Sequence, residues 1–306
     1  MKLTGAEQFC CSIGELMDLK FANEDFVIDK ILPRHGRALL FGDTGAAKTQ
    51  LALTAAINVI RGEDFLDKYA TAKGKVVYIA VGDMPASEFK MKANRLREEL
   101  DNEEKELIRT VYFPDGIDIL EELADEDSWL KQQIKDFNPI FVVVDVISQT
   151  HFGDENGPGV AGPTYNAWRQ ICACDAAPGI LFVHHEKKPP MDMEGYNRKF
   201  AFSGHLQWVN LVSTAMCIIK EKKEIRTLKI VKYRNMAQPV DIKLELDDTT
   251  LLCYPLSHRP VKVWAERQMR KGTPKEEIIA YVQDKSKWRD AASRSSAYDW
   301  TKDYEE

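Results

Sequence analysis

The sequence predicts an α/β fold with a mostly parallel central sheet, and three observations support this class. Short apolar runs typical of buried strands alternate with helical patterns over residues 38–185. A glycine-containing loop connects the first apolar run to an apolar helix. From about Val212 the chain changes to short runs with turn-like breaks, which indicate an antiparallel extension of the sheet. We expect one large α/β domain over residues 1–257 and a small helical unit over 258–306.

The order of the elements follows from these runs. Buried strands are expected at 38–42, 74–81, 110–113, 140–145 and 179–185. Helices are expected at 51–60, 85–100, 117–134 and 165–174, with loops at 150–163 and 186–204. Antiparallel strands are expected at 215–219, 227–234 and 241–246. Ligands of such sheets bind where the carboxyl ends of the parallel strands meet.

The C-terminal residues are expected to form three short helices that resemble a helix-turn-helix. A helical pattern over 260–271 stops at Gly272. Thr273, Pro274 and Glu276 then have the N-cap, first-turn and capping-box positions of a second helix. Units of this kind bind DNA or dock other proteins, and the sequence leaves both possibilities open.

The loop that follows the first strand has the pattern of a phosphate-binding loop (P-loop). Consecutive backbone N–H groups at a helix N-terminus can surround the β-phosphate of a nucleotide. The ammonium of Lys48 would contact the β- and γ-phosphates, and the hydroxyl of Thr49 would bind Mg²⁺. We predict an ATP and Mg²⁺ site with nucleotide-binding residues Gly42, Asp43, Thr44, Gly45, Ala46, Ala47, Lys48, Thr49 and Gln50. The alternative is an ordinary glycine turn between a strand and a helix.

One residue of the loop departs from the strict P-loop pattern. Ala47 stands where the second glycine is expected. If the backbone there has a positive φ, alanine costs about 1 kcal/mol, which a tightly held loop tolerates.

Asp145 ends the most apolar strand of the chain and fits a Walker B carboxylate. Such a carboxylate holds Mg²⁺ through a water molecule, so Thr49 and Asp145 form the predicted metal site. The alternative is that this strand-terminal side chain caps the following turn.

Composition and charge limit the class of protein. The first twenty residues contain three carboxylates and no continuous apolar segment, so no signal peptide is visible. No apolar run approaches the roughly 18 residues that a membrane span requires. We therefore expect a cytoplasmic protein that does not enter a membrane. The formal net charge of −6 argues against wholesale coating of nucleic acid, although a pore or groove can be locally basic.

With these motifs in place, the chain resembles the RecA-like ATPases of the RepA-type hexameric helicase family, whose core is shared with DnaB-type replicative helicases. The resemblance extends from about Ser12 to Leu252 and rests on residues 25–49, 141–148, 181–188 and 230–235. It implies a RecA-like P-loop core and the roles given above for Lys48, Thr49 and Asp145.

The resemblance also assigns catalytic roles to residues outside the P-loop. His184 ends a strand where the family places a γ-phosphate sensor; the alternative is a histidine bonded to a loop carbonyl. Lys232 and Arg234 match the pair of cations that DnaB-like rings project into the neighbouring subunit's nucleotide. Alternate residues of a strand face the same side, so both could contact one phosphate group, but a solvated basic strand face is the alternative. A homo-oligomer, expected to be a hexameric ring, follows from this resemblance.

The strand at 74–81 departs from the family. A glutamate that positions the attacking water usually follows it, whereas this chain has Gly82 and then Asp83. Either Asp83 replaces that glutamate from a shorter side chain, or hydrolysis is slow and the protein is mainly a nucleotide-dependent switch. The loss of such a group commonly costs a few powers of ten in rate.

Single-stranded DNA is the expected nucleic-acid partner. The loop at 186–204 contains the cations Lys187, Lys188, Arg198 and Lys199 with Tyr196, Phe200 and Phe202 between them. Cations that follow a phosphate backbone and aromatic rings that stack on bases are typical of single-strand binding. The alternative is a loop that is only solvated. The loop at 150–163 is acidic and unpromising as a phosphate binder.

Three functions are compatible with these residues. The first is a ring-forming ATPase that moves on single-stranded DNA, a replicative helicase of a plasmid, phage or mobile element. The second is a RecA-like ATP-dependent switch, loader or recombination protein with weak hydrolysis and a replication or recombination partner. The third is a metabolic kinase, for which no acceptor-binding residues are evident.

Overall fold

The computed structural model describes residues 2–3, 12–18, 20–21, 26–82, 85–95, 100–157, 159–185, 206–222, 224–234, 240–247, 250–256, 265, 269 and 273–283. The chain divides into two compact units, Met1–Pro255 and Leu256–Glu306. In the second unit the structure describes helix α10 (Lys275–Val282), which begins after Pro274. The other two predicted helices of that unit lie almost entirely outside the described residues.

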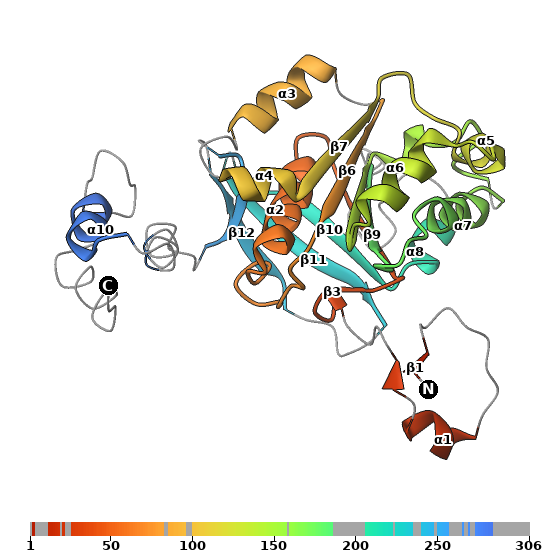
Figure 1. The fold of residues 1–306 in the computed structure, drawn as a ribbon. Coiled ribbons are helices and arrows are strands. Elements are labelled where there is room, and N and C mark those ends of the chain that lie inside the picture. Colours follow the sequence, from red (N-terminus) through yellow and green to blue (C-terminus); the bar gives the residue numbers. More distant parts are fainter. Residues whose placement is uncertain are drawn as a thin grey trace. The chain divides into compact units, whose positions relative to one another are not determined.

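A nine-stranded sheet forms the centre of the first unit (Figure 1). The strands occur in the order β13 (Cys253–Pro255), β12 (Ile242–Leu246), β11 (Ile225–Tyr233), β10 (Thr214–Lys220), β5 (Arg37–Gly42), β9 (Gly179–His185), β8 (Phe141–Asp145), β6 (Val76–Val81) and β7 (Ile108–Phe113). The strands from β10 to β7 are parallel, and β11, β12 and β13 are antiparallel. The predicted α/β fold with a mostly parallel sheet is thus confirmed.

One strand direction differs from the prediction. The first strand after Val212, β10, is parallel to β5 instead of opening the antiparallel part of the sheet. Strand β5 lies between β9 and β10 in the sheet, so β10 is not the hairpin partner of β9, and parallel neighbours need a crossover connection. The antiparallel part begins with the hairpin from β10 to β11.

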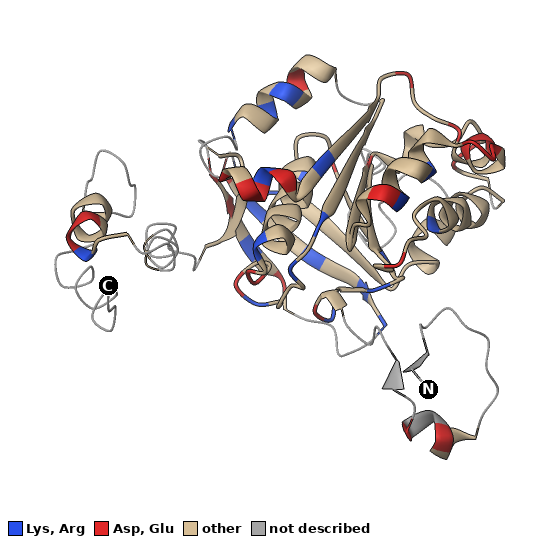
Figure 2. Cartoon of the chain, viewed as in Figure 1, with Lys and Arg blue, Asp and Glu red and all other residues tan. Residues whose placement is uncertain are grey.

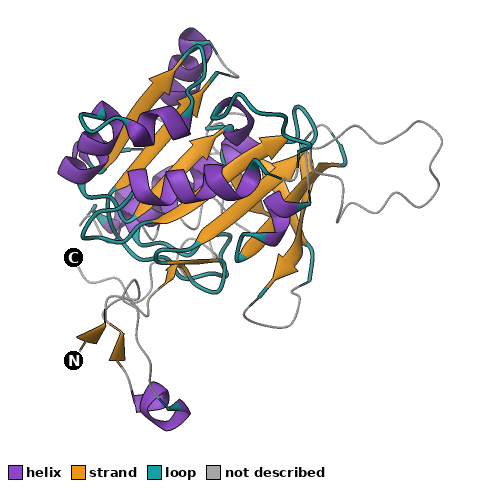
Figure 3. Ribbon diagram, turned by 90° about the vertical axis from the view of Figure 1, so that its right-hand side faces the viewer, coloured by secondary structure: helices purple, strands orange, loops and turns teal. Residues whose placement is uncertain are grey.

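Helices cover both faces of the sheet, and each face has its own hydrophobic core (Figure 3). Helix α2 (Lys48–Arg61) packs on one face with the core that contains Leu40, Tyr78 and Val143. Helices α6 (Trp129–Phe137), α7 (Ala161–Ile171) and α8 (Gln207–Asn210) pack on the other face. Fully buried strands between two helical layers explain why these runs are apolar without alternation.

Two helices differ from their predicted bounds. The helix expected at 117–134 is divided into α5 (Ile119–Ala124) and α6, because Ser128 caps the second helix by accepting the Lys131 N–H at 3.1 Å. Helix α7 begins at Ala161, within the expected loop. Pro163 is compatible with this start because the first-turn N–H groups of a helix have no partner within the helix.

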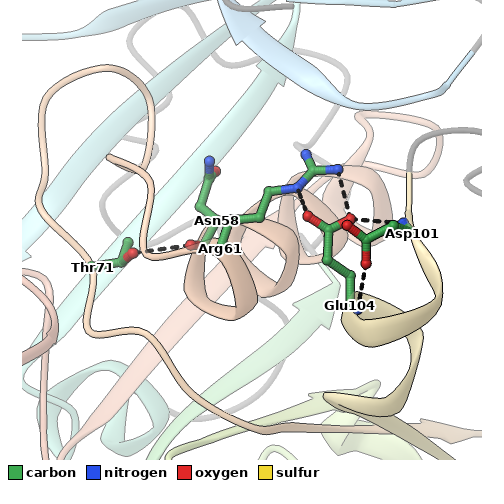
Figure 4. A network of polar contacts seen from close by, with 5 residues as sticks. All are labelled: Asn58, Arg61, Thr71, Asp101 and Glu104. Carbon is green, nitrogen blue, oxygen red and sulfur yellow. Dashed lines mark hydrogen bonds and ion pairs between the residues drawn. The ribbon is translucent and has the colours of Figure 1, made fainter. Parts of the chain in front are cut away.

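Polar contacts hold the C-terminal end of α2 (Figure 4). Arg61 Nε donates to Glu104 Oε1 at 2.9 Å, and the arginine side chain is buried. Glu104 also forms a capping box with Asp101 at the start of α4 (Asn102–Glu106). The Thr71 hydroxyl donates to the Asn58 carbonyl at 3.1 Å. These contacts hold the C-terminal end of α2, the helix whose N-terminus follows the P-loop.

The remaining elements are short. They are β1 (Lys2–Leu3), α1 (Ile13–Asp18), β2 (Lys20–Phe21), β3 (Phe26–Ile28), β4 (Leu32–Pro33), α3 (Ala86–Arg95) and the 3₁₀ turn η1 (Ile147–Gln149). Among the described helices, none is both long enough and apolar enough to cross a membrane.

Candidate nucleotide-binding site

The parallel strands bring four segments to one edge of the sheet. The P-loop follows β5, Gly82 follows β6, Asp145 ends β8, and His184 lies near the end of β9. The pairing of β9 with both β5 and β8 places the histidine strand between the P-loop strand and the Asp145 strand. This is the edge at which open α/β sheets bind ligands.

The P-loop has the backbone conformation that its glycine-like positions require. Gly45 has φ 72°, and Ala47 has φ 77° and ψ 35°, so alanine occupies a left-handed conformation at the position of the missing glycine. Asp43, Thr44 and Gly45 are exposed, while Ala46 and Ala47 are buried. The first part of the loop is thus exposed, and the part next to α2, here called its base, is buried.

A buried arginine from a distant strand fixes this base. Arg226 on β11 is 3% exposed, and its Nε donates to the Ala46 carbonyl at 3.2 Å. Its Nη1 donates to the carbonyls of Lys222 and Ile225 at 3.0 and 3.2 Å. No local pattern indicates this contact, because Arg226 lies 180 residues after the loop that it holds.

Lys48 is the first residue of α2 and lies inside the loop. It is 8% exposed, and its Nζ donates to the carbonyls of Gly42 and Asp43, each at 3.0 Å. Together with the N–H groups at the start of α2, which have no partner within the helix, the ammonium supplies donors suited to phosphate oxygens. Gln50, in the first turn of α2, is half-buried.

The residues of the predicted metal site contact one another. The Thr49 hydroxyl donates to Asp145 Oδ2 at 2.7 Å. The Tyr78 hydroxyl donates to the same oxygen, also at 2.7 Å, from the neighbouring strand β6. Sequence reasoning missed Tyr78, although a hydroxyl inside the apolar run VVYIAV was a signal that a buried partner exists.

These oxygens fit a magnesium ion. Asp145 is 7% exposed, and burial raises the pKa of its carboxyl, while the hydrogen bonds from Tyr78 and Thr49 oppose that rise. A buried carboxylate next to a threonine hydroxyl provides the hard oxygen ligands that Mg²⁺ prefers, and a cation would relieve the cost of burying the charge.

His184 lies on the opposite face of the sheet from Asp145. It is fully buried, and its ring packs edge-on against Trp208 of α8 with centroids 5.5 Å apart. Burial is the main cause that lowers the pKa of His184 to about 3, so the imidazole is neutral. Its Nδ1 accepts the His185 N–H at 2.8 Å, so Nε2 carries the proton.

The proton on His184 Nε2 has no acceptor in the described structure. A buried donor without a partner is costly and calls for an explanation. The strand-end position beside Gly42, which pairs with His185, makes a phosphate oxygen a suitable acceptor. The role of γ-phosphate sensor remains a prediction.

A second histidine lies on the other side of Trp208. His151 stacks on the indole with centroids 5.5 Å apart, and its Nδ1 donates to the Gly153 carbonyl at 3.1 Å. An open pocket beside it is lined by Ser148, Gln149, His151, Phe152, Gly153, Glu155 and His185. Sequence reasoning did not single out His151 or Trp208.

The strand end that lacks the family's glutamate has an unusual backbone. Gly82 has φ 64°, and a Cβ placed on it would lie 3.1 Å from the side chain of Gln149. A side chain at this position is therefore strained by its backbone conformation and by its neighbour. Asp83, the predicted substitute, lies outside the described residues.

Lys232 and Arg234 lie at the amino ends of the parallel strands, whereas the P-loop follows the carboxyl end of β5. Lys232 pairs with Ala215, which pairs with Leu39, and the N–H of Arg234 donates to the Ser213 carbonyl. Along β5, Leu39 lies three residues before Gly42, or roughly 10 Å, and Arg37, whose carbonyl Ser213 contacts, lies five residues before it, or roughly 17 Å. Strand β10 also lies between β11 and β5. Neither cation therefore serves the P-loop of its own chain.

In this structure both cations bind the end of α8. Lys232 Nζ donates to the carbonyls of Val209 and Asn210 at 2.8 and 2.6 Å, and Arg234 Nη2 donates to the Asn210 carbonyl at 2.8 Å. Burial is the main cause that lowers the pKa of Lys232 to about 8, and the nearby Arg234 lowers it further. The predicted DNA-binding cations Lys187, Lys188, Arg198 and Lys199 lie outside the described residues.

Comparisons with known proteins agree with this arrangement. Residues 12–191, more than half of the chain, match the family model AAA_25, described as an AAA domain. No curated protein matches the sequence. The crystal structure of the RadB recombinase is similar to this structure, with a TM-score of 0.52 and 13% sequence identity over 80% of this chain and 97% of that one. At this identity the likeness shows the fold alone.

Proposed function

The chain belongs to the AAA domain family and has a RecA-like P-loop ATPase core, and from this premise we propose that it binds ATP with Mg²⁺ and hydrolyses it to ADP and phosphate. The observation that carries this proposal is the contact between Thr49 and Asp145 beside the buried ammonium of Lys48. These are the ligands that a P-loop ATPase uses to hold a magnesium nucleotide.

Each group of the site has a defined task in this proposal. The P-loop N–H groups and Lys48 bind the phosphates, and Tyr78 orients the carboxylate of Asp145. When bound, Mg²⁺ neutralises charge on the β- and γ-phosphates. The neutral His184 offers its Nε2 proton to the γ-phosphate, so it distinguishes the triphosphate from the diphosphate by a hydrogen bond rather than by charge.

We further propose that the protein acts as a ring on single-stranded DNA, as a replicative helicase. The support for a ring is the position of Lys232 and Arg234, which lie too far from their own P-loop to serve it. Such cations stabilise a transition state only when a neighbouring chain supplies the nucleotide. In this proposal the loop at 186–204 binds DNA, and the unit 258–306 binds DNA or a replication partner.

A second function, an ATP-dependent switch or recombination protein with weak hydrolysis, is favoured by one observation. The left-handed backbone of Gly82 and the Gln149 side chain, 3.1 Å from a Cβ placed there, would strain a water-positioning glutamate at that position. A RadB recombinase has a similar fold, which is compatible with this alternative. Both readings predict slow ATP turnover by the free chain.

The test is an ATPase assay with and without single-stranded DNA, together with unwinding of a forked duplex. Strong stimulation and unwinding support the helicase; DNA binding without unwinding supports the switch. Lys48→Ala is the inactive control. Mixing Lys48→Ala chains with Arg234→Ala chains should restore some hydrolysis if the sites are shared, and failure to do so in intact assemblies contradicts the ring.

A further inference from the structure

Two arginines lie near Lys232 and Arg234 at the end of the sheet opposite the P-loop, and together the four residues form a cluster of cations. The cluster, here called the cationic edge, consists of Arg37, Arg169, Lys232 and Arg234. Arg37 is the first residue of β5, Arg169 lies in the last turn of α7, Lys232 lies on β11 and Arg234 follows that strand. Figure 2 shows basic residues at this end of β11.

The backbone places the two ends of this cluster side by side. The Ser213 N–H donates to the Arg37 carbonyl at 2.8 Å, and the Arg234 N–H donates to the Ser213 carbonyl at 3.3 Å. The guanidinium of Arg37 lies over the ring of Tyr165, 5.4 Å from its centroid. Arg37 therefore faces the same side of the sheet as α7.

Arg169 joins the cluster through the helix geometry. It is four residues after Tyr165 in α7, so both lie on one face of the helix and beside the Arg37 guanidinium. Burial is the main cause that lowers the pKa of Arg37, and the charges of Arg169 and Arg234 act in the same direction. The cations are thus close enough to repel one another.

No carboxylate among the described residues forms an ion pair with any of these side chains. The described ion pairs of the chain involve other cations. Like charges held together without a counter-charge are unfavourable, and such a cluster is suited to an anion. Arginine and lysine form charge-assisted hydrogen bonds with phosphate groups, and the phosphate ligand that the proposed function supplies is the triphosphate of ATP.

We propose that the cationic edge receives the phosphates of a nucleotide held by the P-loop of a second copy of this chain, with Arg37 and Arg169 acting beside Lys232 and Arg234. The inference rests on the proposed function, because that function supplies the nucleotide. It adds two arginines from β5 and α7 to the pair given by the sequence pattern. It also defines a contact surface between copies that includes the start of β5 and the end of α7.

The test is the double variant Arg37→Gln with Arg169→Gln. Arg109→Gln is the matched control, because Arg109 also lies over an aromatic ring, that of Phe137 at 4.4 Å, but on the border strand β7. Assembly is measured by sedimentation velocity with Mg²⁺ and the slowly hydrolysed analogue ATPγS. Nucleotide affinity is measured with a fluorescent ATP analogue at protein concentrations below assembly.

We expect the double variant to assemble about ten- to a hundredfold more weakly with ATPγS, as the loss of charge-assisted contacts predicts. Its nucleotide affinity as a single chain should stay within about twofold of the wild type, because its own P-loop is untouched. The control should assemble normally. Arg37→Lys with Arg169→Lys should restore part of the assembly, which separates a lost charge from a damaged fold.

Three results would overturn the inference. Wild-type assembly by the double variant removes Arg37 and Arg169 from the contact while leaving the ATPase proposal intact. Normal assembly with weaker binding of a single-stranded oligonucleotide assigns the cationic edge to DNA. A wild-type chain that binds no ATP analogue removes the ligand itself, and with it the proposed function.

Discussion

The neutral state of His184 can be tested by acid unfolding, without any nucleotide. The folded-state pKa of about 3 lies below the ordinary value of 6.5, and burial is the main cause. Between these two values the unfolded chain binds a proton that the folded chain does not. Stability is therefore complete above pH 6.5 and is lost as the pH falls toward 3.

The size of the effect follows from this window. At pH 5 the unfolded imidazole is about 1.5 pH units below its pKa, and each unit corresponds to about 1.4 kcal/mol. His184 alone should therefore remove about 2 kcal/mol from the free energy of unfolding between pH 7.5 and 5. Other groups titrate in the same range, so the informative quantity is the difference between wild type and His184→Gln.

The assay is urea unfolding followed by circular dichroism at pH 7.5, 6.5, 5.5 and 5.0. The stability of His184→Gln should fall less steeply than that of the wild type, with the two curves converging by about 2 kcal/mol at pH 5. Thr214→Val is the control, because its buried hydroxyl also has no partner but does not titrate. Parallel curves for wild type and His184→Gln would refute the buried, neutral imidazole and the donor assigned to Nε2.

Further predictions concern the metal site, the basic pair and the strand end without glutamate. Tyr78→Phe removes a hydrogen bond to the buried Asp145 carboxylate, which is worth about 1.5–3 kcal/mol. We therefore expect Mn²⁺ with ADP to bind roughly ten- to a hundredfold more weakly, as measured by electron paramagnetic resonance. Unchanged Mn²⁺ affinity would exclude a positioning role for Tyr78. Raising the pH from 7 to 9 takes Lys232 through its pKa of about 8, so nucleotide-dependent assembly should weaken. The contribution of Lys232 to the stability of the single chain should instead rise between pH 8 and 10.5, because only the unfolded chain keeps the lysine proton there. Equal assembly at pH 7 and 9 in both the wild type and Lys232→Arg would contradict this prediction. Gly82→Ala and Gly82→Glu should each lower the free energy of unfolding by about 1–2 kcal/mol because φ is positive, and Gly82→Glu should not raise ATP turnover; a faster Gly82→Glu enzyme would show that the backbone can accept the family's residue.

Most of the fold could be predicted because the signals were local. Runs such as VVYIAV and FVVVD are buried on both sides, and their lack of alternation is visible in the sequence. The predicted direction of β10 was wrong, because that direction depends on which strand β10 pairs with, and no local sequence pattern indicates this. The division between α5 and α6 depends on the cap at Ser128 inside a polar stretch that also has a helical pattern.

The site was predictable where one segment supplies the chemistry, and not where distant segments meet. The P-loop pattern located Lys48 and Thr49, and the strand end located Asp145; the structure brings Thr49 and Asp145 into contact. Arg226, Tyr78 and the rings around Trp208 act through tertiary contacts and left weak signals or none. The roles of Asp83 and the basic loop stay predictions, because those residues lie outside the described part of the chain.

The separation of the P-loop and the cationic edge has a consequence for assembly. The two surfaces lie at opposite ends of the strands of one sheet. Copies joined through them therefore follow one another head to tail, and the contact is heterologous. Such a series either closes into a cycle or grows as a helical filament, depending only on the rotation between successive copies. A small change in that angle would therefore separate a ring motor from a recombination filament built on the same contacts.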